Sequence, residues 1–255
     1  MDKAKKKILV VDDEINVCKS IRQAILSDDY DVDMALSGEE ALEKDKGNHY
    51  DLVISDLMMP GISGMELLTS LKKERPEILV ILVTGYPTIK TAVQSVKTGA
   101  FDYLPKPFTP NELRSLVLRA FKAQESDTQE MPASRAMPPG LFSMRGHTWL
   151  RREDNDAATI GIAYEFIQSL ESVEHLELPK ENTNIFQGEV CARITDKDTR
   201  VHRVWSPASG KIIQVNHELE QDLSLLKRDP YAQGWLLRIK SPNLEIDLKG
   251  LTPSE

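Results

Sequence analysis

The stretch Tyr50-Asp51-Leu52-Val53-Ile54-Ser55-Asp56 is an apolar run that ends on a carboxylate, and it decides how the first half of the chain folds. Four further apolar runs of strand length flank it, at Ile8–Val11, Val32–Leu36, Ile78–Val83 and Phe101–Leu104. Helix-like segments alternate with these runs; the first, after Asp13, carries apolar residues on one face at Val17, Ile21, Ala24 and Ile25. The alternation predicts an α/β doubly wound fold with a parallel five-stranded sheet.

Polar side chains fall at the ends of these predicted strands, at Asp12, Asp13, Asp56, Thr84 and Lys106. In open parallel sheets, functional side chains collect beyond the carboxyl ends of the strands, near the point where the strand order reverses. We therefore expect these residues to meet. Three neighbouring carboxylates repel one another unless a cation is present. Mg²⁺ is the expected cation, because it prefers oxygen ligands and keeps several waters.

This set of groups suits reversible aspartyl phosphorylation. Phosphoryl transfer needs an in-line nucleophile and fixed positive charge around the equatorial oxygens of the phosphoryl group. In this interpretation Asp56 is the nucleophile, and Mg²⁺ and Lys106 supply the charge. Thr84 would donate its hydroxyl to the phosphoryl group, and Tyr103 would turn into the space that the Thr84 loop leaves. The sequence therefore predicts a signalling switch.

Residues 5–123 resemble the receiver domain of two-component response regulators, which has a flavodoxin-like fold. The resemblance lies in four segments, Val10–Glu14, Asp56–Gly64, Val83–Tyr86 and Phe101–Phe108. It implies that a sensor histidine kinase donates the phosphoryl group, and that the domain catalyses its own phosphorylation and slow dephosphorylation. It also implies that Mg²⁺ is bound by Asp13, Asp56 and the backbone carbonyl of Met58, that Asp12 acts through water, and that the Lys106-Pro107 bond is cis.

The second half of the chain has a different pattern. The segment 124–139 has little apolar periodicity and three prolines, which predicts a linker to a second domain over 140–245. Short strand-like runs follow, at Thr159–Ile162, His175–Leu178, Glu189–Ile194, Gly210–Val215 and Trp235–Ile239. They predict a small, mainly-β sandwich or barrel. We see no pattern of a separate catalytic domain or of a helix-turn-helix.

Residues 145–240 resemble the H-protein of the glycine cleavage system, a carrier of the lipoyl/biotinyl type. The matching segments are Gly146–Leu150, Ile160–Ile162, Leu176–Pro179, Ser206–Gly210 with Val215-Asn216, and Asp229–Leu236. In that family, lipoate is attached to a lysine at the tip of a β hairpin. Counting from either side places that position at Asp198 or Thr199, and the lysine nearby is Lys197. Lys197 is thus either an ordinary exposed turn residue or the site of lipoate attachment.

Three functions are compatible with these patterns. The first is a response regulator whose H-protein-like domain has lost the lipoyl lysine and binds a protein partner, with a receiver-mediated homodimer as a further possibility. The second is a lipoyl carrier that is gated by phosphorylation and carries lipoate on Lys197. The third is a DNA-binding transcriptional regulator, which would need a basic groove-reading element that we do not find.

Charge and hydropathy limit which partners and which cellular location we expect for this protein. The 255 residues carry a formal charge of −8, which argues against a broad nucleic-acid surface. No apolar run approaches the roughly 20 residues of a membrane span. The basic start is followed by only a short apolar run, so we expect no signal peptide. Cys18 and Cys191 are expected to stay reduced. We therefore expect a cytoplasmic protein without nucleic-acid or membrane partners.

Overall fold

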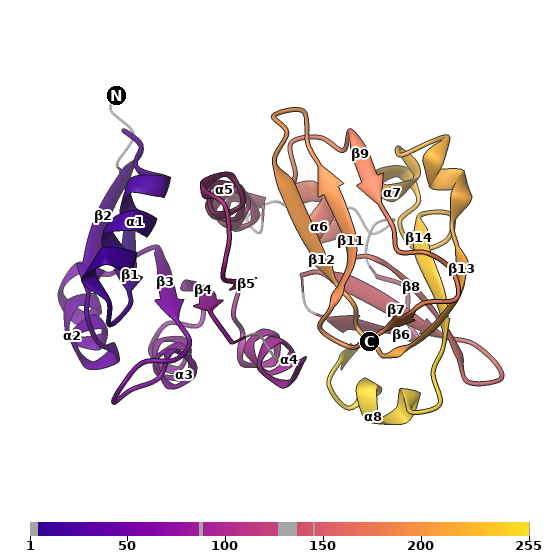
Figure 1. Cartoon of the computed structure of the whole chain (residues 1–255), viewed down its shortest axis with the longest axis horizontal. Coiled ribbons are helices and arrows are strands. Elements are labelled where there is room, and N and C mark those ends of the chain that lie inside the picture. Colours follow the sequence, from indigo (N-terminus) through magenta and orange to yellow (C-terminus); the bar gives the residue numbers. More distant parts are fainter. Residues whose placement is uncertain (1–4, 87–88, 127–136, 145, 255) are drawn as a thin grey trace. The chain divides into compact units, whose positions relative to one another are not determined.

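The computed structural model describes residues 5–86, 89–126, 137–144 and 146–254. The chain divides into two compact units, residues 1–117 and 118–255 (Figure 1). Within the described residues, no helix has the length and apolar character needed to cross a membrane. Most of the predicted linker, residues 127–136, lies outside the described residues.

The first unit is built on a five-stranded parallel sheet, which confirms the predicted α/β fold. The strand order is β2-β1-β3-β4-β5, so the order reverses between β1 and β3. The strands are β1 (Lys6–Val11), β2 (Tyr30–Ala35), β3 (Leu52–Asp56), β4 (Leu79–Thr84) and β5 (Asp102–Pro105). The helices are α1 (Ile15–Ile25), α2 (Gly38–Asn48), α3 (Gly64–Glu74), α4 (Ile89–Thr98) and the first part of α5 (Pro110–Ser126), which continues into the second unit beyond residue 117. In Figure 1, α1 and α5 lie on one face of the sheet, and α2, α3 and α4 lie on the other.

The pattern of buried residues explains why the helices pack on both faces of this sheet. Every residue of β3 is buried, as expected for a central strand with helices on both faces. On α1 the buried residues are Cys18, Ile21 and Ile25, which share one helical face. The start of α3 is fixed by a capping box, in which Ser63 and Glu66 each accept the other's backbone N–H. This cap places the helix directly after the loop that follows Asp56.

The second unit is mainly β, as the sequence predicts, and its strands are antiparallel. One sheet has seven strands in the order β10-β13-β14-β8-β7-β6-β15, and the other has three in the order β12-β11-β9. The strands are β6 (Leu141–Met144), β7 (Thr148–Arg152), β8 (Ala157–Ile162), β9 (His175–Glu177), β10 (Asn184–Ile185), β11 (Val190–Thr195), β12 (Val201–Trp205), β13 (Gly210–Val215), β14 (Trp235–Lys240) and β15 (Thr252–Pro253). Short helical segments are α6 (Tyr164–Ser169), η2 (His217–Glu220), α7 (Leu225–Arg228) and α8 (Leu244–Leu248).

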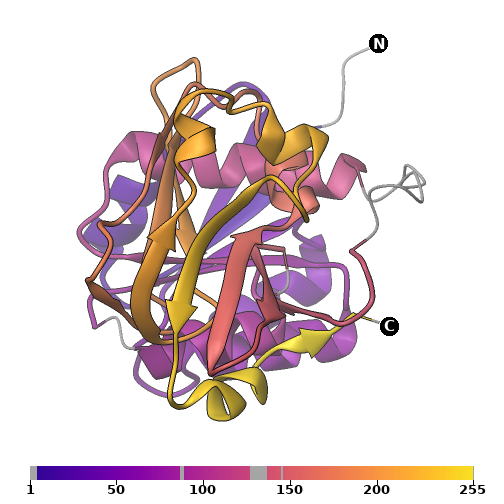
Figure 2. The ribbon, with the colours of Figure 1, turned by 90° about the vertical axis from the view of Figure 1, so that its right-hand side faces the viewer.

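In the larger sheet, the ring of Trp149 packs so close to the backbone of residue 161 that this residue must be a glycine. Strand β8 runs beside β7 and β14 (Figure 2), and Gly161 lies opposite both Trp149 and Trp235. Trp149 is fully buried, and a Cβ atom on Gly161 would lie 2.3 Å from two carbons of its ring. The Trp149 indole N–H donates to the carbonyl of Pro230 at 3.1 Å. A glycine is therefore required for this tryptophan to pack on the sheet.

The predicted domain limits, 5–123 and 140–245, stay predictions. Strand β15 pairs with β6 through Thr252 and Pro253, so the larger sheet includes residues beyond 245. Strands β6, β7, β10, β12 and β15 were not predicted from the sequence. β10 and β15 have only two residues each, too few to produce a readable alternation.

Candidate functional site

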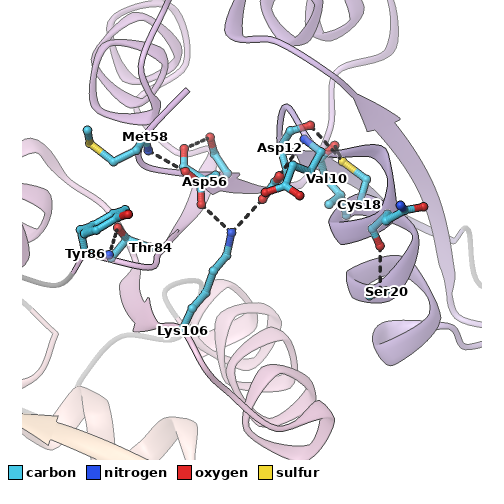
Figure 3. Close-up of polar contacts among 12 residues, drawn as sticks. Val10, Asp12, Cys18, Ser20, Asp56, Met58, Thr84, Tyr86 and Lys106 are labelled. Atoms are coloured by element: carbon cyan, nitrogen blue, oxygen red, sulfur yellow. Dashed lines mark hydrogen bonds and ion pairs between the residues drawn. The ribbon is translucent and has the colours of Figure 1, made fainter. Parts of the chain in front are cut away.

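Two carboxylates and one ammonium group meet at the carboxyl edge of the first sheet (Figure 3). Lys106 Nζ lies 2.6 Å from Asp56 Oδ1 and 2.9 Å from Asp12 Oδ2. The side chains of Asp12 and Asp56 are 3% and 9% exposed, whereas that of Lys106 is 27% exposed. The one ammonium therefore bridges two nearly buried carboxylates and compensates part of their repulsion.

The surroundings of Lys106 favour its charged form. Burial alone would lower the pKa of Lys106, but the hydrogen bonds and negative charges of Asp56 and Asp12 outweigh it and raise the pKa. The Lys106 ammonium is therefore a fixed positive charge at neutral pH. The peptide bond from Lys106 to Pro107 is cis, as the resemblance implies.

The strand ends explain why these residues meet. Asp12 directly follows β1, Asp56 ends β3, and Thr84 ends β4, and these parallel strands are neighbours in the sheet. The backbone N–H of Lys106 donates to the carbonyl of Thr84 at 2.7 Å, which holds the start of the loop after β5 against the end of β4. The topological switch point between β1 and β3 therefore carries the acidic residues, where such sheets place ligands.

The other predicted residues surround this centre. Asp13 follows Asp12 and is exposed. Thr84 is fully buried, and its hydroxyl oxygen accepts the backbone N–H of Tyr86 at 3.1 Å. Tyr103, on β5, is also buried, and its hydroxyl lies 3.2 Å from the Thr91 hydroxyl on α4. The structure thus places a tyrosine contact between β5 and α4.

The loop after Asp56 folds tightly back on the site. The backbone N–H of Met58 donates to Asp56 Oδ2 at 2.6 Å. A Cβ atom on Gly64 would lie 2.1 Å from the carbonyl oxygen of Asp56, so only glycine allows this approach. Glu39, at the start of α2, accepts the backbone N–H of Ile62 at 3.0 Å and ties down the same loop. Sequence analysis did not single out Glu39, because nothing local in the sequence indicates that its side chain reaches the loop after β3.

The donor atoms suit a hard cation. Among the described residues, no three His, Cys, Asp or Glu side chains are grouped as a metal site. Mg²⁺ needs fewer protein ligands than that, because it is commonly bound by one or two carboxylates and keeps several waters. Asp12 and Asp56 supply two converging carboxylates with exposed Asp13 beside them, so the oxygen donors fit Mg²⁺.

In the second unit, Lys197 lies at the tip of the hairpin that joins β11 to β12. Its side chain is 59% exposed, and its Nζ lies 3.3 Å from Glu171 Oε2. Its backbone N–H donates to the Ser172 hydroxyl at 2.9 Å. Thr199 has a positive φ of 59°, which makes the turn compact. The tip therefore presents one lysine, paired with a carboxylate outside the hairpin.

Comparison with known families agrees with this geometry. Residues 8–118 match the response regulator receiver domain, and residues 141–255 match the glycine cleavage H-protein. The chain therefore carries the receiver domain of a two-component response regulator, fused to a glycine cleavage H-protein domain.

Individual relatives match one half of the chain at a time. The transcriptional regulatory protein ZraR of Escherichia coli K12 is 37% identical over 134 residues, which cover 52% of this chain and 30% of ZraR. A receiver domain structure from Clostridium thermocellum is 36% identical, with a TM-score of 0.45, and covers 47% of this chain and 97% of that one. The glycine cleavage H-protein structure from Mycobacterium marinum is 24% identical, with a TM-score of 0.39, and covers 42% and 87%. The chain thus spans less than a third of the length of ZraR.

Proposed function

We propose that this protein is a response regulator that accepts a phosphoryl group on Asp56 and signals through its H-protein domain, which binds a partner protein. The arrangement of Asp56, Lys106 and Asp12 at the switch point carries the proposal. A buried carboxylate beside a fixed ammonium is suited to hold a phosphoryl group, because the ammonium can compensate the added negative charge.

The phosphoryl donor is a phosphohistidine of a sensor kinase. An Asp56 carboxylate oxygen attacks phosphorus, a new P–O bond forms, and the P–N bond to the histidine breaks. Lys106 would contact an oxygen of the transferred group. Asp13, Asp56 and the Met58 carbonyl would hold Mg²⁺, with Asp12 acting through water, and the ion would supply further charge compensation. Hydrolysis of the acyl phosphate by water resets the site, and these two reactions are the only catalysis we propose.

Phosphorylation would reach the surface through Thr84 and Tyr103. The Thr84 hydroxyl accepts the N–H of Tyr86, so its own proton can be donated to a phosphoryl oxygen. That bond would draw the end of β4 inward. Tyr103, which is already buried, would then shift into the space that this loop leaves and give up its contact with Thr91 on α4. The surface of α4 and β5 would change, and it would either release the H-protein domain or form a receiver homodimer.

Two exposed side chains would control how long the phosphoryl group lasts. Met58 is 61% exposed and Tyr86 is 78% exposed, and each lies two residues beyond a site residue. Their bulk would limit the access of water to the acyl phosphate. We therefore expect the phosphoryl group to be long-lived, and we expect alanine at both positions to shorten its half-life. A wild-type half-life of only seconds in Mg²⁺ buffer would contradict this part of the proposal.

Acetyl phosphate tests the acceptor site without a kinase. Wild-type protein incubated with acetyl phosphate and Mg²⁺ should gain one phosphoryl group in its intact mass, and Asp56→Asn should gain none. Asp28→Asn, an exposed aspartate on the α1–β2 loop, is the matched control and should behave like the wild type. Phosphorylation of Asp56→Asn to the wild-type level would rule out Asp56 as the acceptor.

For the H-protein domain, we propose that it does not carry lipoate. Counting along the family pattern places the lipoyl lysine at Asp198 or Thr199, neither of which is a lysine, and Lys197 is engaged by Glu171. One observation favours the alternative, a lipoyl carrier gated by phosphorylation: Lys197 is an exposed lysine at the hairpin tip. Peptide mapping of protein purified from its own cells distinguishes them. Lipoate on the Lys197 peptide would establish the lipoyl carrier. An unmodified Lys197 peptide would support the protein-binding domain, provided that other proteins in the same extract are lipoylated.

Transcriptional regulation is the less favoured function. ZraR is named a transcriptional regulatory protein, but this chain spans only 30% of its length. The chain carries a formal charge of −8, which is unfavourable for binding a polyanion. A gel shift at physiological salt should therefore show no retarded DNA, and specific retardation would restore this function.

A further inference from the structure

A groove of about 340 Å³ in the H-protein domain, which Lys197 does not line, lies between β9 with the residues that follow it and the end of β13 with η2. Its apolar residues are buried or half-buried, and they are Leu176, Leu178, Pro179, Val215 and Leu219. The charged residues that line it are exposed, and they are Lys180, Glu181, His217 and Glu220. The groove therefore has an apolar floor and a charged rim, the arrangement of a peptide-binding site.

One wall of the groove is a sheet edge. Strand β9 pairs with β11 through His175, Leu176 and Glu177, and it is the last strand of the three-stranded sheet (Figure 1). No strand in the described part of the chain pairs with its other side. An edge strand offers backbone N–H and C=O groups to a further strand. Side chains alternate along a strand, so Leu176 and Leu178 both line the groove, while Glu177 between them is exposed.

Negative charge dominates around the groove. Glu174 and Glu177 are exposed on or beside β9, and Glu181 and Glu220 are exposed on the rim. His217 Nδ1 lies 2.8 Å from Glu220 Oε1, so this imidazole compensates one of the carboxylates when it is protonated. Lys180 is the one lysine or arginine that lines the groove. A basic partner would therefore be attracted, and an acidic one repelled.

We propose that the outer edge of β9 and this groove bind an extended peptide segment of a partner protein, which adds to the sheet as a further strand. The segment carries apolar side chains at alternate positions, which enter the groove, and Lys or Arg at its ends, which face the acidic rim. Backbone hydrogen bonds to β9 supply affinity, and the groove supplies specificity. This proposal rests on the proposed protein-binding role of the H-protein domain, and it specifies the class of partner.

Random peptides displayed on phage and selected on the full-length protein test this site. The selected sequences should share alternating apolar positions flanked by Lys or Arg. A synthetic peptide of the consensus should bind Leu178→Asp at least about tenfold more weakly, since a buried carboxylate costs more than 1.4 kcal/mol. Ile246→Asp changes an exposed side chain on α8; it is the matched control and should bind like the wild type.

A second variant protects the test against misfolding. Glu174→Lys with Glu220→Lys changes only exposed side chains, and it should weaken the consensus peptide and abolish the salt dependence of its binding. Failure to enrich such peptides, or equal binding by Leu178→Asp, would overturn the groove proposal. Neither result would affect phosphorylation of Asp56, so the receiver assignment is tested separately. Selected peptides that carry Lys or Arg but share no alternating apolar positions would also contradict the groove proposal.

Discussion

The carboxylate of Asp196 should hold the hairpin tip that carries Lys197. Its Oδ1 accepts the backbone N–H groups of Asp198 and Arg200, both at 2.9 Å. Its Oδ2 lies 3.2 Å from Nε2 of His202, and the side chain is only 2% exposed. Burial alone would raise the pKa of Asp196, but the N–H of Arg200 and the His202 ring lower it, so the carboxylate stays charged. We therefore expect Asp196→Ala to open the turn.

The hydrogen bonds of Asp196 determine how much stability Asp196→Ala should lose. Each hydrogen bond to a charged acceptor contributes about 1.5 kcal/mol, so losing the two backbone bonds costs about 3 kcal/mol. His202, which is also buried, would lose its carboxylate partner, at about 1 kcal/mol more. Asp198→Ala is the matched control: the Asp198 side chain is 43% exposed and pairs with Arg200 at 3.0 Å, a surface ion pair worth less than about 1 kcal/mol.

Urea unfolding followed by tryptophan fluorescence measures this difference. All three tryptophans, Trp149, Trp205 and Trp235, lie in the second unit, so the signal reports that unit alone. Asp196→Ala should lower its free energy of unfolding by about 4 kcal/mol and Asp198→Ala by less than about 1 kcal/mol. If the two variants unfold within about 0.5 kcal/mol of each other, Asp196 does not hold the turn.

Three further predictions concern other sites. Lys106→Gln should slow phosphorylation by acetyl phosphate on the order of 100-fold, as measured by intact mass over time, and an unchanged rate would exclude its charge from the reaction. Gly161→Ala should cost about 2 kcal/mol in urea unfolding because its Cβ meets the Trp149 ring, and less in a Trp149→Phe background; equal costs would refute the clash. Burial lowers the pKa of His202 to about 4, so the stability contributed by its neutral form is present above pH 6.5 and lost as the pH falls toward 4. The pKa of His217 is raised by its hydrogen-bonded carboxylate, so that contact is lost as the pH rises through this pKa. An NMR titration in which His202 protonates before His217 as the pH falls would contradict both assignments.

The sequence predicts the first fold well because one rule covers all of it. Long apolar runs alternate with amphipathic helices, so each strand end could be located and each polar residue assigned to the same edge. Asp12, Asp56 and Lys106 meet as expected. Glu39 could not be predicted, because its side chain joins the start of α2 to Ile62, which lies in a loop more than twenty residues further along the chain.

The second fold is harder to predict in detail. Its strands are short, and β10 and β15 have only two residues each, so alternation is too brief to identify them. The groove beside β9 brings together Leu176 and Val215, which are far apart in the sequence. The burial of Asp196 also could not be predicted from the sequence, because an aspartate in a turn is usually exposed. Only the fold shows that this one is buried.

The central claim is that Asp56 carries the phosphoryl group, and reductive trapping tests it most directly. Full-length protein is phosphorylated with acetyl phosphate and Mg²⁺, and borohydride then reduces the acyl phosphate at the modified aspartate to an alcohol, which releases phosphate and leaves homoserine. We predict homoserine at position 56 in the peptide map, and none in protein that was not phosphorylated. Homoserine at Asp12 or Asp13, or at none of the three, would contradict the account.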